Sequence, residues 1–127
     1  MTGTVLVIDD EMDVQTYLSA LLQKEGLKVE TASDGEEGLI RARAVKPDLI
    51  FLDILMPRKT GIMLYRRLKE DPALAAVPVV ILTGLSQYRS FFAQDFEHVP
   101  HPEAFVEKPP NPQELLDLAR RLVPAAR

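Results

Sequence analysis

Short runs of apolar residues recur along the chain and are separated by longer stretches of mixed polarity. Three runs are continuous and, taken together, rich in β-branched residues: residues 5–8, 49–52 and 79–82. Such runs are typical of strands that are buried on both faces of a parallel sheet. We expect weaker strands at residues 27–32 and Ala104–Glu107. The pattern therefore predicts five strands.

The stretches between the apolar runs have helical periodicity. Apolar residues recur at helical spacing over residues 11–25, and Gly26 follows where such a helix would end. Further helices are expected at residues 35–45, 62–70 and 112–123. The last has a clear start signal, because Asn111 can cap it and Pro112 suits its first turn. Strands and helices thus alternate, and right-handed crossovers then require an α/β, doubly wound parallel sheet.

Length and composition limit the number of domains and the kinds of partner that the chain can have. The 127 residues are enough for one domain, which we expect over residues 1–127 with a core at about 4–123, and 46% of them are hydrophobic. The chain has no Cys, and its formal net charge is −4, which disfavours direct binding of nucleic acid. No apolar run is long enough to span a membrane, and we expect a cytoplasmic protein.

Acidic residues follow two of the predicted strands. Asp9 and Asp10 come directly after the first strand, and Asp53 comes directly after the third. In a doubly wound sheet, ligands bind at the carboxyl ends of the strands. Three carboxylates in one pocket repel each other unless a cation compensates, and oxygen ligands favour a hard ion such as Mg²⁺. The sequence therefore predicts a magnesium site.

Two further strand ends supply complementary groups. Thr83 ends the fourth strand with a hydroxyl, and Lys108 ends the fifth with a positive charge suited to a phosphate. Each residue alone is ordinary in a turn or on a surface. Together with the acids and a metal, they form a pocket suited to phosphoryl transfer.

These residues resemble a known family. The pair Asp9-Asp10, the run Asp53-Ile-Leu-Met-Pro57, Thr83 followed by a small residue, and Phe105 three positions before Lys108 resemble the receiver domain of two-component response regulators. The resemblance implies a flavodoxin-like fold of the chemotaxis-regulator type, with five strands in the order 2-1-3-4-5.

The resemblance also implies roles for individual residues. Asp53 would accept a phosphoryl group from a phosphohistidine of a histidine kinase or a histidine phosphotransfer protein. Mg²⁺ would be held by Asp10, Asp53 and the backbone carbonyl of Leu55, with Asp9 acting through water. Lys108 would pair with the phosphoryl group, Thr83 would reorient towards it, and Phe105 would turn inward as the aromatic switch.

The segment between Thr83 and Lys108 departs from the usual receiver pattern. It is about three residues longer than is usual, which affects the fourth helix and the atypical stretch at residues 86–103. Residues 86–96 hold four of the eight aromatic residues, three of them at helical spacing. We expect the fourth helix, the fifth strand and the final helix to form a surface for a second copy or a downstream protein.

Two other functions remain open. The chain is expected to be a phosphorylation-controlled switch rather than a turnover enzyme, but a degenerate receiver could act as a constitutive interaction domain. A Mg²⁺-dependent aspartyl phosphohydrolase would use an Asp after the first strand and needs a second Asp two residues later. Here Glu11 stands two residues after Asp9, which makes the hydrolase the weakest alternative.

Overall fold

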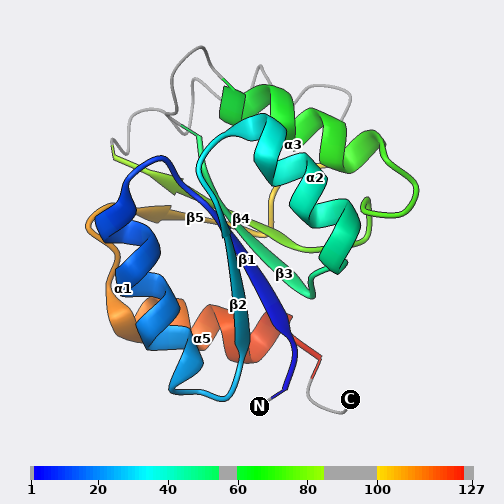
Figure 1. The fold of residues 1–127 in the computed structure, drawn as a ribbon. Helices are drawn as coiled ribbons and strands as arrows, with labels where there is room; N and C mark the ends of the chain where they lie inside the picture. Colours follow the sequence, from blue (N-terminus) through cyan, green and yellow to red (C-terminus); the bar gives the residue numbers. More distant parts are fainter. Residues whose placement is uncertain (1, 55–59, 85–99, 125–127) are drawn as a thin grey trace.

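A parallel five-stranded sheet forms the centre of the molecule (Figure 1). The computed structural model describes residues 2–54, 60–84 and 100–124. Along these ranges the elements are β1 (Thr4–Ile8), α1 (Met12–Gln23), β2 (Lys28–Ala32), α2 (Gly35–Val45), β3 (Leu49–Asp53), α3 (Thr60–Glu70), β4 (Val79–Thr83), β5 (Ala104–Glu107) and α5 (Pro112–Leu122). The strand order is β2-β1-β3-β4-β5, so the predicted doubly wound fold is confirmed.

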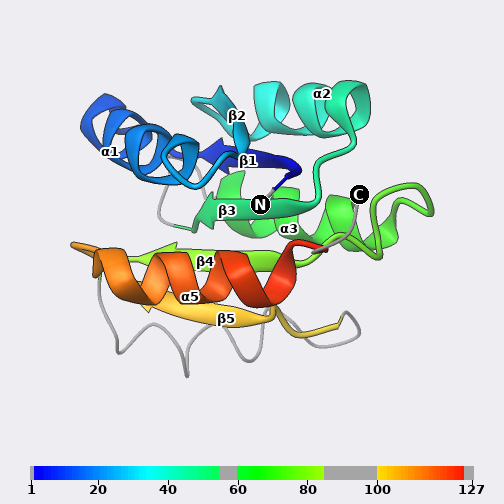
Figure 2. The same ribbon diagram turned by 90° about the horizontal axis from the view of Figure 1, so that it is seen from below.

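Among the described residues, α1 and α5 cover one face of the sheet, and α2 and α3 cover the other (Figures 1 and 2). The α1/α5 cluster contains Val5, Val7, Leu18, Leu22, Leu27, Leu49, Phe51, Val80, Leu82, Val106, Leu115, Leu118, Ala119 and Val123. The α2/α3 cluster contains Leu6, Ile8, Ala32, Leu39, Ala42, Ile50, Leu52, Ile54, Leu64, Tyr65, Leu68, Leu74, Val79 and Ile81. Neighbouring residues of a strand enter opposite clusters because strand side chains alternate between faces. The apolar runs are continuous for this reason.

The helix ends agree with the sequence signals, with small shifts. Leu27 N–H donates to Leu22 O and Gly26 N–H donates to Gln23 O, the pattern of a Schellman motif in which Gly26 has a φ of +88°. The side chain of Asn111 accepts from two backbone N–H groups and caps α5 as predicted.

Two helices begin at positions that differ from those expected. Helix α1 begins at Met12 rather than at residue 11, because Glu11 has extended backbone angles and occupies the N-cap position. Helix α3 begins at Thr60 rather than at residue 62. Its first turn precedes the amphipathic pattern from which the start was predicted.

Several predicted features lie outside the described residues. These are the backbone carbonyl of Leu55, the fourth helix over residues 86–96 and most of the atypical stretch at residues 86–103. Within the described ranges, no helix combines the length and the apolar character that a bilayer crossing requires.

Candidate functional site

The predicted site residues lie at the carboxyl-terminal edge of the sheet. Asp53 is the last residue of β3, Asp9 directly follows β1, and Lys108 directly follows β5. In each strand, the residue two positions earlier packs in the α1/α5 cluster. Strand alternation therefore directs these three side chains towards the α1 side of the sheet, where they meet.

Lys108 lies among three carboxylates. Its Nζ atom is 2.8 Å from Asp9 Oδ2, 2.8 Å from Glu11 Oε1 and 3.4 Å from Asp53 Oδ2. The backbone N–H of Lys108 donates to Thr83 O at 2.7 Å, which extends the pairing of β4 with β5 up to the site. Pairing with β4 thus fixes the backbone of Lys108, and the carboxylates fix the position of its ammonium group.

Asp9 is held in a defined orientation. Its Oδ1 atom accepts the backbone N–H of Glu11 at 2.9 Å. Its Oδ2 atom is buried and receives no well-directed hydrogen bond from the described residues, although the Lys108 ammonium lies close to it. A buried carboxylate oxygen in this condition is suited to a cation or an ordered water.

The electrostatic environment keeps Lys108 charged. Burial lowers the pKa of its ammonium, but the contacts with Asp9 and Glu11 and the charge of Asp53 outweigh burial. The pKa of Lys108 is therefore raised above its ordinary value. The lysine supplies a permanent positive charge next to Asp53 at neutral pH.

The acids are close enough to share one cation. Asp9, Asp10, Glu11 and Asp53 each offer a carboxylate oxygen, and these atoms lie within 4.8 Å of one another. Asp9 and Asp53 are buried, whereas Asp10 and Glu11 are exposed. A donor set made only of oxygen fits a hard divalent ion such as Mg²⁺. The residues present therefore fit the metal that the sequence predicts.

Thr83 and Phe105 lie on the other side of the sheet from the lysine. Thr83 is fully buried at the end of β4, and Ile81, two residues earlier, belongs to the α2/α3 cluster. Phe105 is directly opposite Ile81 in the register of β4 and β5, and it packs against the same cluster. The two predicted switch residues are therefore neighbours on one face.

One residue that organises the site was not identified from the sequence. The buried side-chain amide of Gln15 in α1 donates to Asp9 O at 2.6 Å and to Ser33 Oγ at 3.1 Å. It joins the loop after β1 to the loop after β2. A signal was present, because Gln15 shares the buried face of α1 with Leu18 and Leu22, where an apolar residue is expected.

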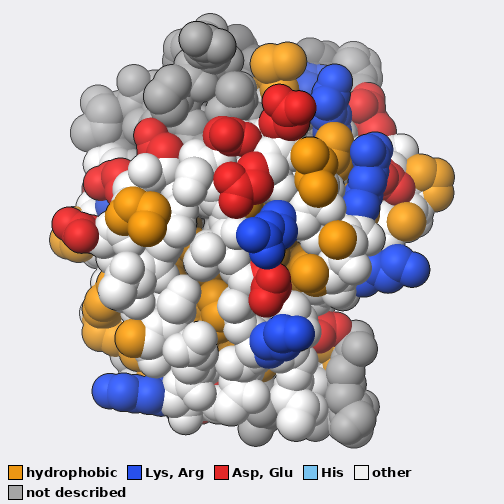
Figure 3. All heavy atoms as spheres, viewed as in Figure 1, with side chains coloured by type: hydrophobic (Ala, Val, Ile, Leu, Met, Phe, Trp, Pro, Cys, Tyr) orange, Lys and Arg blue, Asp and Glu red, His pale blue; other side chains and the backbone are white. Residues whose placement is uncertain are grey.

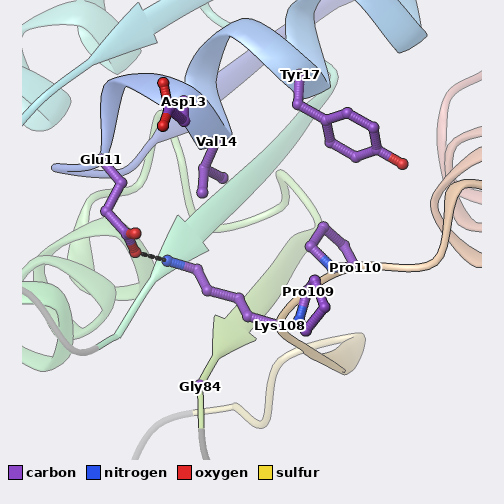
Figure 4. A pocket seen from close by; sticks show the side chains of 8 residues that line it. All are labelled: Glu11, Asp13, Val14, Tyr17, Gly84, Lys108, Pro109 and Pro110. Atoms are coloured by element: carbon purple, nitrogen blue, oxygen red, sulfur yellow. Dashed lines mark hydrogen bonds and ion pairs between the residues drawn. The ribbon is translucent and has the colours of Figure 1, made fainter.

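A pocket of about 660 Å³ opens beside the lysine (Figure 4). It is lined by Glu11, Asp13, Val14, Tyr17, Gly84, Lys108, Pro109 and Pro110. The figure shows the side chain of Lys108 reaching towards Glu11, with residues of α1 on one side and the two prolines on the other. The pocket joins an apolar surface to the charged site.

Another face of the molecule carries charges of both signs. In Figure 3, acidic and basic side chains are interspersed rather than gathered into a single patch. Both basic residues of α2 are paired, Arg41 with Glu30 and Arg43 with Asp71, each at 3.1 Å.

Known proteins resemble both the sequence and the fold. The family model of the response regulator receiver domain matches residues 5–120. Protein Rrf1 of Nitratidesulfovibrio vulgaris is 30% identical over 95% of this chain and 83% of its own length. The transcriptional regulatory protein PhoP of Bacillus subtilis is 40% identical over 66% of this chain, but the match spans 34% of PhoP.

The fold has a close counterpart among solved structures. Chemotaxis protein CheY4 of Vibrio cholerae superposes with a TM-score of 0.84 at 29% identity, covering 97% of this chain and 100% of that chain. The family match extends over most of the chain and includes β2 to β5 and all of β1 except Thr4. The chain belongs to the family of response regulator receiver domains.

Proposed function

We propose that residues 1–127 form one receiver domain that acts as a phosphorylation-controlled switch, with Asp53 as the phosphoacceptor. The observation that carries this proposal is the position of the Asp53 carboxylate. It is 3% exposed, lies at the open end of β3 and is 3.4 Å from the Lys108 ammonium. Burial holds this carboxylate at the carboxyl end of the sheet, next to a positive charge.

The reaction transfers one phosphoryl group from a phosphohistidine of a kinase or phosphotransfer protein. An oxygen of Asp53 attacks the phosphorus atom, a P–O bond forms, and the P–N bond to the histidine breaks. The imidazole leaves with the electron pair of that bond and takes up a proton. Lys108 provides positive charge for the phosphoryl oxygens as negative charge shifts towards Asp53.

The acidic residues support a magnesium-dependent reaction. Asp10, Asp53 and the backbone carbonyl of Leu55 would hold Mg²⁺, and Asp9 would act through a bound water. Bound Mg²⁺ would supply charge that offsets the repulsion between the phosphoryl group and the carboxylates. Within the described residues, the grouping of four carboxylates supports this assignment.

The proposed switch acts through Thr83 and Phe105. Movement of the Thr83 hydroxyl towards a phosphoryl group on Asp53 would empty space on the α2/α3 side of the sheet. Phe105 is half-buried on that side and lies beside the strand that ends in Thr83. The ring would then turn inward and change the surface formed by β5, α5 and the fourth helix, where a second copy or a downstream protein would bind.

The pocket beside α1 suits the docking of the phosphodonor. Val14, Tyr17 and Pro110 line it next to Lys108, and Tyr17 is 39% exposed. A partner that covers this apolar surface would bring its histidine close to Asp53 and exclude water from the reaction. A histidine kinase or a histidine phosphotransfer protein is the expected partner.

Labelling with a small phosphodonor tests the proposed function. The protein is incubated with acetyl phosphate and Mg²⁺, and intact-mass spectrometry is expected to find one added phosphoryl group. Asp53→Asn should abolish the addition, whereas Asp117→Asn, at an exposed position on α5, should retain it. Phosphate that persists in Asp53→Asn would overturn the assignment, and phosphate on Asp9 would favour a hydrolase.

A further inference from the structure

Lys108 divides its contacts among three acids of unequal burial. An ammonium group has three N–H bonds, and Lys108 faces Asp9, Glu11 and Asp53. The distance from Nζ is 2.8 Å to Asp9 and to Glu11, but 3.4 Å to Asp53. The weakest of the three contacts is therefore the one with the proposed phosphoacceptor.

Glu11 is the partner that Lys108 can leave at least cost. The side chain of Glu11 is 60% exposed, whereas those of Asp9 and Asp53 are buried. An exposed ion pair contributes little because water solvates both charges after they separate. A buried carboxylate that loses its counter-charge has no such compensation.

The local structure leaves the Glu11 side chain available for this contact. Glu11 occupies the N-cap position of α1, yet its side chain makes no capping hydrogen bond. Its backbone N–H donates to Asp9 Oδ1, and its backbone oxygen accepts the N–H of Gln15. The backbone is thus fixed, and the side chain extends to Lys108 Nζ (Figure 4).

We propose that Glu11 is a positioning residue that holds Lys108 away from Asp53 until Asp53 is phosphorylated. This inference rests on the proposed function and adds a step to it. A phosphoryl group carries a charge of about −1.5 to −2, against −1 on the carboxylate that it modifies. Lys108 then exchanges its contact with Glu11 for one with the phosphoryl oxygens, and Glu11 turns into solvent.

Two substitutions of Glu11 separate the effect of its contact with Lys108 from the effect of its negative charge. Glu11→Asp keeps the charge but shortens the side chain by one methylene, so the carboxylate no longer reaches Lys108. Glu11→Gln keeps the length and removes the charge. The matched variant is Asp13→Asn, which removes a charge from the first turn of the same helix at an exposed residue that lines the same pocket.

The first readout is affinity for beryllofluoride, a phosphoryl analogue, at saturating Mg²⁺. Both Glu11 variants are expected to bind it about two- to fivefold more tightly, the range that a surface ion pair allows. Asp13→Asn reports the effect of the charge alone. The gain in beryllofluoride affinity in Glu11→Gln beyond that in Asp13→Asn therefore measures the contact between Glu11 and Lys108.

The second readout needs neither metal nor phosphoryl analogue. In protein labelled with ¹⁵N-lysine and kept in EDTA, the ammonium resonance of Lys108 should shift in both Glu11 variants more than in Asp13→Asn. Thermal unfolding checks that both Glu11 variants fold. It also measures any stabilisation of α1 in Glu11→Asp, because Asp is a favoured residue at the N-cap position.

The outcomes distinguish this inference from the proposed function. If the wild-type protein binds beryllofluoride and Glu11→Asp binds it with equal or lower affinity, Glu11 does not restrain Lys108. If the ammonium resonance is the same in wild type and both Glu11 variants, the contact is absent in solution. If no variant binds beryllofluoride while the resonance does shift, the contact exists and the proposed function fails.

Discussion

Gly61 in α3 packs directly against the backbone of Asp53. A β-carbon at position 61 would lie 2.5 Å from the carbonyl oxygen of Asp53 and 2.7 Å from the α-carbon of Ile54. Backbone atoms cannot turn aside as the end of a flexible side chain can. The first turn of α3 therefore approaches β3 closely only because residue 61 has no side chain.

Gly61→Ala is expected to destabilise the protein and to slow phosphorylation. Overpacking at such a contact costs about 1–3 kcal/mol, and the displaced backbone would carry the Asp53 carboxylate away from Lys108. Urea unfolding and the initial rate of labelling by acetyl phosphate measure the two effects. Gly84→Ala serves as the steric control for stability, because a β-carbon at position 84 meets no atom within 4 Å among the described residues. Equal unfolding curves for the two variants would contradict this account.

Asp10→Asn should stabilise the protein when no metal is present and remove its response to Mg²⁺. The carboxylate of Asp10 is grouped with three others within 4.8 Å. Repulsion between two such charges is on the order of 1 kcal/mol even in water, so neutralising Asp10 should raise the melting temperature by a few degrees. Thermal unfolding with and without Mg²⁺ tests this, with Asp13→Asn as the control. A Mg²⁺-dependent rise in melting temperature equal to that of the wild type would remove Asp10 from the metal site.

Stability should fall at high pH through Lys108. The folded protein raises the pKa of this lysine, so its contribution is fully present below the unfolded value of about 10.4. It is lost as pH rises through the higher folded pKa. The free energy of unfolding, measured between neutral and strongly alkaline pH, should show a weaker decline in Lys108→Met than in wild type. Lys28→Met, at an exposed position on β2, should keep the wild-type slope.

Tyr65→Phe should loosen the entry to β5. Tyr65 is buried in α3, and its hydroxyl donates to the backbone oxygen of Pro100. Burial and then the charge of Glu103 raise the pKa of this hydroxyl, which keeps it protonated as a donor. Loss of the hydrogen bond is expected to cost about 1 kcal/mol.

Hydrogen exchange locates the effect of Tyr65→Phe. The amide of Glu103 donates to Val79 O at 2.9 Å and lies just before β5, so its exchange should accelerate. Tyr17→Phe changes an exposed tyrosine of α1 and should leave that amide unaffected. Unchanged protection of Glu103 in Tyr65→Phe would mean that the hydroxyl does not hold this segment.

The strands were predictable from the sequence because they are buried on both faces. Residues 49–52 and 79–82 are continuous apolar runs, and each lies within an observed strand that extends one residue further, to Asp53 and to Thr83. Placement of the acids and of Lys108 at one edge followed from the rule for parallel sheets. The roles of Asp53, Thr83 and Phe105 in phosphorylation came from the family resemblance and stay predictions.

Other features depend on contacts that local sequence does not encode. Glu11 and Lys108 are separated by 97 positions, and their pairing requires the loop after β1 to meet the end of β5. The hydrogen bond from Tyr65 to Pro100 joins positions 35 apart and is likewise visible only in the folded chain. Helical periodicity predicts which face of α3 is buried, but it does not predict which carbonyl accepts the hydrogen bond of the Tyr65 hydroxyl.

The division of the core into two clusters has a consequence for how such a protein diversifies. Residues beneath α1 and α5 are separated by the sheet from those beneath α2 and α3. Substitutions in the two clusters should therefore combine nearly additively, and a lineage can repack one layer while the other stays as it is. The strand ends have no such independence, because Asp53 projects on one side of the sheet and Thr83 on the other. A substitution at the strand ends must therefore be compatible with both clusters at once.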